Sequence, residues 1–269
     1  LLIKMMLSIS ISDIMKINYE KVNFAHYSNQ GTQISLDTFI FNNEKLMIRP
    51  KFVCYLVNEK KKGKEFVAYV SRLPTSIVLK DFSEQLSIQR NIKYPSILNY
   101  YGYNERNFKH DPYPVLILEF CKRGTLSEVL SFQNNCELEK KGFSDWNNTK
   151  KMINLIGVAL GMNYLHKHNI IHRSLRCLNV FLDENLYPKI GGFDGSKMFS
   201  SELNHVDFDG PDYCIAPEYI NDDEPYSFPI DVFAYGMLFY HIITNKKPTI
   251  PHFNIGKLYS LIVKGERPT

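Results

Sequence analysis

The sequence predicts an α+β protein in which a small β-rich N-terminal lobe precedes a larger helical C-terminal lobe, with a cleft at their junction. Between residues 36 and 120, apolar residues fall in short runs rich in β-branched and aromatic side chains. From about residue 122 the pattern becomes helical. A length of 269 residues with 44% hydrophobic content fits one large domain or two lobes.

A β-hairpin is the first element that the pattern indicates. Phe52–Val57 and Phe66–Val70 are β-rich runs, and Lys60–Gly63 lies between them. Because turn residues are normally solvated, we interpret the three lysines of this stretch as the surface of a turn.

Two further elements complete the expected N-terminal lobe. Val115–Leu118 is an apolar run typical of a buried strand. Leu79–Lys93 is predicted to be a helix with Phe82 and Leu86 on one side, and Pro95 follows as a stop signal.

The predicted C-terminal lobe is built around two apolar helices. Thr149–His168 is apolar on nearly every face, as expected of a central helix. Ile230–Thr244 is similar, but it contains Asp231 and is too short to span a bilayer, which takes about 18 or more apolar residues. Both segments are therefore expected to lie in a protein core, and no membrane span is predicted.

Composition excludes several classes of function. A net charge of +4 gives no case for a nucleic acid or a membrane as partner. Five cysteines without CxxC spacing argue for a reducing compartment, the cytoplasm, and against a zinc site or a disulfide framework. The histidines outside the catalytic-loop motif described below show no metal-ligand pattern, and we expect His166 and His168 to be capping or surface residues.

Several short motifs, in one consistent order, resemble those of protein kinase domains. They are Val67–Val70 where that family has V-A-I-K, Ile171–Asp183 for the catalytic loop H-R-D-L-x-x-x-N, Gly192–Asp194 where it has D-F-G, Ala216–Glu218 for A-P-E, and Asp231–Gly236 for the start of the central buried helix. Arg176 and Gly265–Pro268 resemble the tyrosine-kinase-like group of serine/threonine kinases.

The resemblance implies a two-lobed protein-kinase-like fold with a truncated C-lobe. We expect an N-terminal extension over residues 1–35 and a kinase-like domain over 36–269. Its N-lobe should span about 36–118, the hinge about 119–124 and the incomplete C-lobe about 125–269.

Phosphoryl transfer depends on positioned charges more than on covalent chemistry, and the charged positions of the family are altered here. Val70 stands at the position of the phosphate-binding lysine and Gln85 at that of its glutamate partner. Ser174 replaces the catalytic aspartate, and Gly192 replaces the aspartate that holds magnesium. A serine hydroxyl is no useful base near neutral pH, so the resemblance implies that no catalytic residue is intact.

Two side chains could act as displaced substitutes. Arg72 lies two residues after Val70 and should point to the same side of the strand. Asp194 and Asn179 are weak candidates for a metal site, because Asp194 occupies the glycine position of the motif and an amide alone holds magnesium poorly. The positions of the family's three phosphate-loop glycines fall on Met47, Arg49 and Phe52, whose side chains would obstruct a phosphate.

The resemblance also implies a set of retained residues. Those expected around adenine are Ala68, Glu119, Cys121, Asn179 and Phe181. Those expected to form the structural framework are His172, Arg173, Phe193, Glu218 and Asp231. Ser196, Ser200 and Ser201 lie where the family carries activation-loop phosphates, and Gln89 is polar where the family packs an apolar side chain.

We interpret the chain as a pseudokinase that acts as a signalling scaffold or allosteric regulator. Its expected partners are proteins, an active kinase among them, and ATP is compatible with the chain without catalysis while magnesium is not expected. One alternative is an active serine/threonine kinase that uses Arg72 and Asp194. Another is a fragment of a decayed gene.

Overall fold

The computed structural model describes residues 33–132, 138–139, 142–199, 213–220, 226–249 and 255–267. These residues fall into two compact units. The N-terminal unit holds the described residues up to Lys93 together with Leu98–Cys121, and the C-terminal unit holds Tyr94–Ile97 and the described residues from Lys122 onward. Residues 1–32 of the expected extension, like Ser200 and Ser201, lie outside the described residues.

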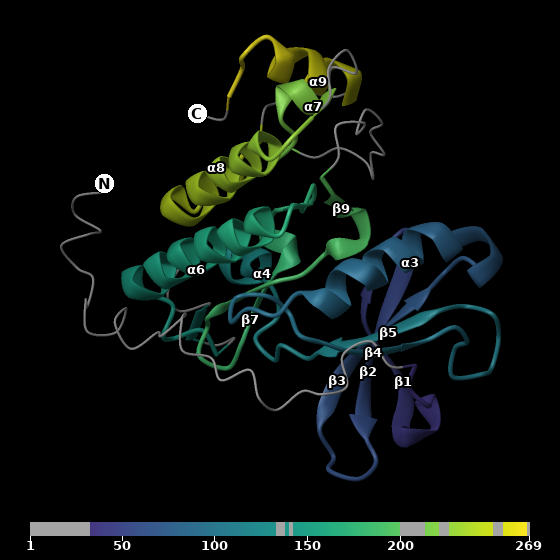
Figure 1. The fold of residues 1–269 in the computed structure, drawn as a ribbon. Helices are drawn as coiled ribbons and strands as arrows, with labels where there is room; N and C mark the ends of the chain where they lie inside the picture. The colour runs from purple at the N-terminus through teal and green to yellow at the C-terminus, as the bar shows by residue number, and fades with distance from the viewer. Residues whose placement is uncertain are drawn as a thin grey trace. The chain divides into compact units, whose positions relative to one another are not determined.

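The N-terminal unit is one antiparallel sheet with a helix beside it (Figure 1). Its strand order is β1-β2-β3-β5-β4, so β1 and β4 form the edges. The elements are η2 (Leu36–Thr38), β1 (Phe39–Ile48), β2 (Phe52–Glu59), β3 (Glu65–Ser71), α3 (Thr75–Asn91), β4 (Tyr100–Asn104) and β5 (Val115–Glu119).

The predicted hairpin is confirmed as β2 and β3. Gly63 adopts φ +64° in the connecting turn, a left-handed conformation that glycine accepts without strain. The three lysines of the turn are exposed, as predicted. Val57, Ala68 and Ile117 on β2, β3 and β5 are completely buried, and they form the centre of the core of this unit.

Helix α3 begins at Thr75, four residues before the predicted start. Its first turn contains Ile77, which is 67% exposed, so apolar periodicity gives no signal there. The start is set instead by tertiary hydrogen bonds, because the Thr75 hydroxyl lies 2.9 Å from the Glu105 carbonyl and 3.1 Å from that of Pro112.

The C-terminal unit is mainly helical and contains two small two-stranded sheets, β6 with β9 and β7 with β8. Its elements are α4 (Leu126–Ser131), α6 (Asn148–Lys167), β6 (Ile170–Ile171), η3 (Cys177–Asn179), β7 (Val180–Leu182), β8 (Pro188–Ile190), η4 (Phe193–Gly195), β9 (Lys197–Met198), α7 (Pro217–Ile220), α8 (Pro229–Thr244) and α9 (Ile255–Val263).

Helices α6 and α8 match the two predicted core helices and lie side by side (Figure 1). The Asn147 side chain caps α6 by accepting the Lys150 N–H at 3.0 Å. Together the two helices position the loop between them that carries the catalytic-loop motif. No helix in the described part of the chain is long and apolar enough to cross a membrane.

Candidate functional site

One buried carboxylate accepts hydrogen bonds from the backbone of the catalytic-loop motif. Asp231, on the first turn of α8, is 1% exposed. Its Oδ2 accepts the backbone N–H of His172 at 2.8 Å, and its Oδ1 accepts that of Arg173 at 2.8 Å. Because a buried carboxylate is costly unless its oxygens are hydrogen-bonded, these two bonds fix the loop to the helix.

A third contact to this carboxylate overturns one sequence prediction. His166, on the last turn of α6, places Nε2 2.9 Å from Asp231 Oδ2. We had expected a capping or surface residue, and that prediction was wrong for His166. The two residues are 65 positions apart in the chain, so local spacing carries no signal for the pair. His168, in contrast, is exposed and contacts the Tyr164 carbonyl.

His172 is held as a neutral imidazole. It is completely buried, and burial lowers its pKa despite the opposing effect of nearby Asp231. Nε2 lies 3.0 Å from the Gly191 carbonyl, and Nδ1 accepts the Ser174 N–H at 3.3 Å. A neutral ring with its proton on Nε2 satisfies both bonds, and the ring packs edge-on against Phe193 at 5.0 Å.

The positions of the catalytic base and of the metal ligand meet at Asn179. Its Nδ2 donates to the Ser174 carbonyl at 2.7 Å and lies 2.9 Å from the Ser174 hydroxyl. Gly192 adopts φ +78°, and a Cβ added there would lie 2.6 Å from both Cγ and Nδ2 of Asn179. A side chain at this position would adopt a left-handed conformation that glycine accepts most readily, and the Asn179 amide would have to shift to make room for it.

Asp194 is the carboxylate nearest in sequence to the altered metal-ligand position. It lies on η4 in the first turn after Gly192 and is half-buried. No group of three or more His, Cys, Asp or Glu side chains that could hold a metal occurs among the described residues. Magnesium is normally held by one or two carboxylates together with substrate phosphates, and Gly192 supplies no ligand at the position where the family has its carboxylate.

In the N-terminal unit the former ion pair is replaced by uncharged side chains. Val70 pairs with Val53 on β2 and Val115 on β5, and it packs against the apolar core. Gln85 is half-buried on α3. Neither side chain can supply the positive charge that holds phosphates.

Arg72 and the β1–β2 turn are engaged with each other. Arg72 is exposed, and its Nη1 donates to the Arg49 carbonyl at 3.2 Å and to the Pro50 carbonyl at 3.4 Å. Arg49 in turn places Nε 2.9 Å from Met47 Sδ. The turn is thus closed by side chains where the family has glycines.

The residues expected around adenine belong to both units. In the N-terminal unit Ala68 is fully buried, and Glu119 Oε2 accepts from the backbone and side-chain nitrogens of Asn99 at 3.1 and 2.7 Å. Cys121 is buried at the end of this unit. In the C-terminal unit Phe181 is half-buried on β7.

The guanidinium of Arg173 is enclosed by two tyrosines. Its Nε donates to Tyr219 Oη at 2.8 Å, and its Cζ lies 5.5 Å and 5.3 Å from the ring centres of Tyr219 and Tyr226. The two rings meet edge-on at 4.8 Å. Cation–π contacts of this kind stabilise a charge without a phosphate. The sequence analysis did not single out either tyrosine.

Three other residues singled out in the sequence differ in their exposure and hydrogen bonding. Glu218 is exposed and forms no hydrogen bond or ion pair within the described ranges. Ser196 is 3% exposed, and its hydroxyl donates to the His172 carbonyl at 3.1 Å, so it is not accessible to a kinase. Gln89 is 3% exposed, and its Oε1 has no hydrogen-bond partner among the residues described.

Comparison with known proteins agrees with this geometry. The protein kinase domain family matches residues 53–263. The chain is 34% identical over 159 residues to mitogen-activated protein kinase kinase kinase 13-A of Xenopus laevis, an alignment that covers 59% of this chain and 15% of the relative. It is 32% identical over 173 residues to a probable serine/threonine-protein kinase of Dictyostelium discoideum, covering 63% of this chain and 16% of the relative.

A third relative is matched over nearly the whole chain. Serine/threonine-protein kinase STY46 of Arabidopsis thaliana is 24% identical over 258 residues, which are 96% of this chain and 39% of the relative. The chain thus spans less than half the length of each of these relatives. With the family matched over most of its length, and with the sheet and helices described above, the chain belongs to the protein kinase domain family.

Proposed function

We propose that this kinase domain is a pseudokinase that works as a signalling scaffold or allosteric regulator. The observation that carries the proposal is the Gly192 conformation, in which Asn179 fills the space that a side chain at this position would need. A magnesium-binding aspartate here would have to adopt the left-handed conformation and displace the Asn179 amide.

The other altered positions support the same conclusion. Ser174 offers a hydroxyl that is already within hydrogen-bond distance of Asn179, and a hydroxyl does not accept a proton usefully near neutral pH. Val70 is an apolar side chain that packs against the core of the N-terminal unit. Loss of a positioned base alone costs about 10²–10⁴-fold in rate, and losses within one catalytic unit are not independent.

The runner-up function is an active serine/threonine kinase with displaced residues, as the names of its relatives suggest. Arg72 and Asp194 would have to hold phosphate and metal. Arg72 is directed to the carbonyls of the β1–β2 turn, and Asp194 belongs to no group of three or more metal-ligating side chains within the described ranges. These contacts favour the pseudokinase.

Partners, cofactor and location follow as parts of the proposal. The partners are proteins, and an active kinase of the same tyrosine-kinase-like group fits the scaffold role. Any ATP that this domain binds is held without magnesium and without catalysis. The location is the cytoplasm, in keeping with the four described cysteines, which are thiols and not disulfides.

A phosphotransfer assay separates the two functions. The full chain is incubated with radiolabelled ATP, magnesium and a general protein substrate, and label is counted against a heat-denatured control. The pseudokinase predicts no incorporation above that control. Incorporation that disappears in Asp194→Asn, but persists in the matched variant Asp183→Asn, would establish the displaced-residue kinase instead.

A further inference from the structure

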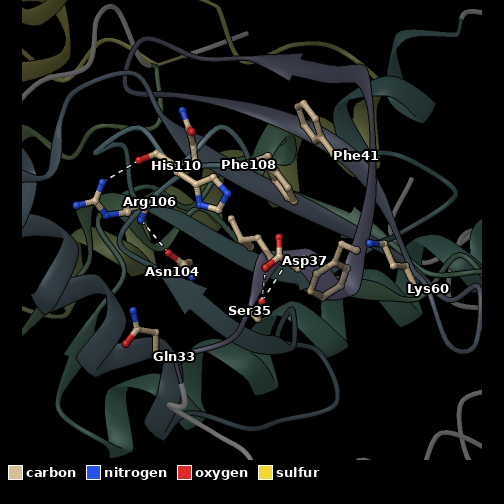
Figure 2. A pocket seen from close by; sticks show the side chains of 12 residues that line it. Gln33, Ser35, Asp37, Phe41, Lys60, Asn104, Arg106, Phe108 and His110 are labelled. Carbon is tan, nitrogen blue, oxygen red and sulfur yellow. Dashed lines mark hydrogen bonds between the residues drawn. The ribbon is translucent and has the colours of Figure 1, made fainter.

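The N-terminal unit contains a cavity that no kinase function uses. It encloses about 520 Å³ and is lined by the segment that enters β1, by Lys60 in the β2–β3 turn, and by the connection between β4 and β5 (Figure 2). Cavities of roughly 300–1,000 Å³ are the size that binds small ligands or a few side chains of a partner.

The apolar wall of the cavity is aromatic and preformed. Phe41 on β1 and Phe108 in the β4–β5 connection stack nearly parallel, with ring centres 4.4 Å apart and planes at 11°. Phe39 lines the same cavity and meets Phe66 of the core edge-on. Such a wall offers large apolar contact without needing to reorganise.

The loop that closes the cavity is stiffened by its own hydrogen bonds. Asn107 Oδ1 accepts the N–H groups of Lys109 at 2.8 Å and Asp111 at 3.1 Å, and Arg106 Nη1 donates to the His110 carbonyl at 2.9 Å. His110 is held at φ +64°, a conformation that costs free energy in a non-glycine residue. Strain maintained in this way is typical of loops that present a binding surface.

Charges of both signs border the aromatic wall. Figure 2 shows Lys60 and Arg106 at opposite sides, with Asp37 and Phe108 between them. Among the described residues no ion pair joins Lys60 or Arg106 to a carboxylate, and the Asp37 carboxylate accepts from the Ser35 hydroxyl at 3.2 Å. Two uncompensated cations therefore favour an anionic ligand, and one carboxylate in the middle disfavours a compact polyanion such as a phosphate.

We propose that this cavity docks a short acidic peptide segment of a partner protein. Glutamate or aspartate side chains of the segment pair with Lys60 and Arg106, while an apolar side chain between them packs on Phe41 and Phe108. Backbone N–H groups of the peptide donate to Asp37. A peptide is the ligand that supplies carboxylates, an apolar group and N–H donors together, and the site is independent of nucleotide chemistry.

The test is selection of a phage-displayed random heptapeptide library on the full chain. We expect enrichment of sequences that combine two or more carboxylates with one aromatic or branched apolar residue. The best sequence is then labelled with fluorescein and its affinity measured by anisotropy. Lys60→Glu and Arg106→Glu should each weaken binding about tenfold, since each loses one attraction and gains a repulsion.

Matched control variants make the result specific. Lys61→Glu and Lys109→Glu carry the same charge change on exposed neighbours in the same turn and the same loop, outside the cavity lining, and should alter affinity by less than about twofold. Equal weakening by control and cavity variants, no enrichment, or enrichment of basic sequences would overturn the proposal. So would displacement of the peptide by inorganic phosphate or ATP, or a dimer of the chain that Lys60→Glu dissociates.

A failed docking test would leave the pseudokinase proposal intact. The phosphotransfer assay measures catalysis, which depends on the altered positions Ser174 and Gly192 of the C-terminal unit. The peptide assay measures binding to a cavity within the N-terminal unit. The two proposals can therefore fail separately.

Discussion

At the scale of single residues, Gly192 differs from the family motif in its backbone conformation as well as in its missing carboxylate. Gly192 would be an ordinary substitution if its conformation suited any residue. Its positive φ and the closeness of Asn179 make any side chain at this position strained and crowded. We expect the family aspartate at this one site to require a shift of Asn179 as well.

The cost of a side chain at this position can be measured. Gly192→Ala should lower the free energy of unfolding by about 1–3 kcal/mol, through left-handed strain and the clash with Asn179. The control is Gly195→Ala, because a Cβ at Gly195 meets nothing within 4 Å and its φ is not positive. Denaturant unfolding measures the free energy of unfolding of both variants. Equal stability of the two variants would contradict the expected strain and crowding at Gly192.

The buried imidazole predicts a dependence of stability on pH. His172 has its pKa lowered by burial, so the folded state binds fewer protons than the unfolded state, whose histidine pKa is about 6.5. The free energy of unfolding should therefore fall as pH decreases through about 6.5 toward the folded pKa. His241 contributes in the same direction, because burial and Lys247 lower its pKa as well.

A variant separates the two histidines. His172→Tyr keeps a ring beside Phe193 but removes the titration, so its loss of stability between about pH 7.5 and pH 5.5 should be smaller than in the unmodified chain. Thermal midpoints at both values provide the comparison. An unchanged pH dependence would assign the effect to His241 or to other groups.

At the scale of elements, the contact between the catalytic loop and α7 is made by a cation and two rings. In kinases that are switched by activation-loop phosphate, the arginine of this loop pairs with the phosphate. Here Arg173 donates to Tyr219 and is flanked by Tyr226. A phosphate that binds Nε and Nη2 of this guanidinium would have to displace the Tyr219 hydroxyl.

Double-mutant analysis tests this contact. Tyr219→Phe should cost about 1–2 kcal/mol of stability, because the hydroxyl accepts from a charged donor. In the background of Arg173→Met the same substitution should cost at least about 1 kcal/mol less. Additive effects of the two substitutions would mean that the hydrogen bond does not contribute.

Some helices and strands were predictable from the sequence alone and others were not. The β2–β3 hairpin, α6 and α8 were predictable because alternation, turn residues and long apolar runs are local signals. Strand β4 was not predicted individually, since Tyr100–Asn104 carries tyrosines, a glycine and an asparagine and is defined by pairing with β5. Helix α4 was missed although Thr125 and Glu128 form a capping box, a signal that the sequence does contain.

The same contrast applies to the candidate site. The motif order located Ser174, Asn179 and Gly192 in the sequence, but only the structure shows that Asn179 fills the space beside Gly192. The contact of His166 with Asp231 and the tyrosines around Arg173 join segments that are far apart in the chain. Contacts of this kind have no period or spacing from which they could be read.

At the scale of the whole molecule, two units are each stabilised by their own core, and the proposed functions are divided between them. The C-terminal unit keeps the framework of a catalytic loop, with Asp231 and His172 in place, while Ser174 and Gly192 stand at two charged positions of the family motif. The N-terminal unit adds a cavity lined by aromatic and charged side chains. A kinase domain with this combination is, in our proposal, suited to holding partners.

The central claim is that no magnesium-dependent nucleotide chemistry remains, and thermal unfolding of the full chain with millimolar ATP, with and without magnesium, tests it most directly. A ligand at about 100 times its dissociation constant stabilises a protein by about 2.7 kcal/mol, which a melting curve detects. We predict either no shift, or a shift of the same size in both conditions as ATP binds without metal. A shift that requires magnesium would contradict the claim, because it would mean that a carboxylate of this chain holds the ion.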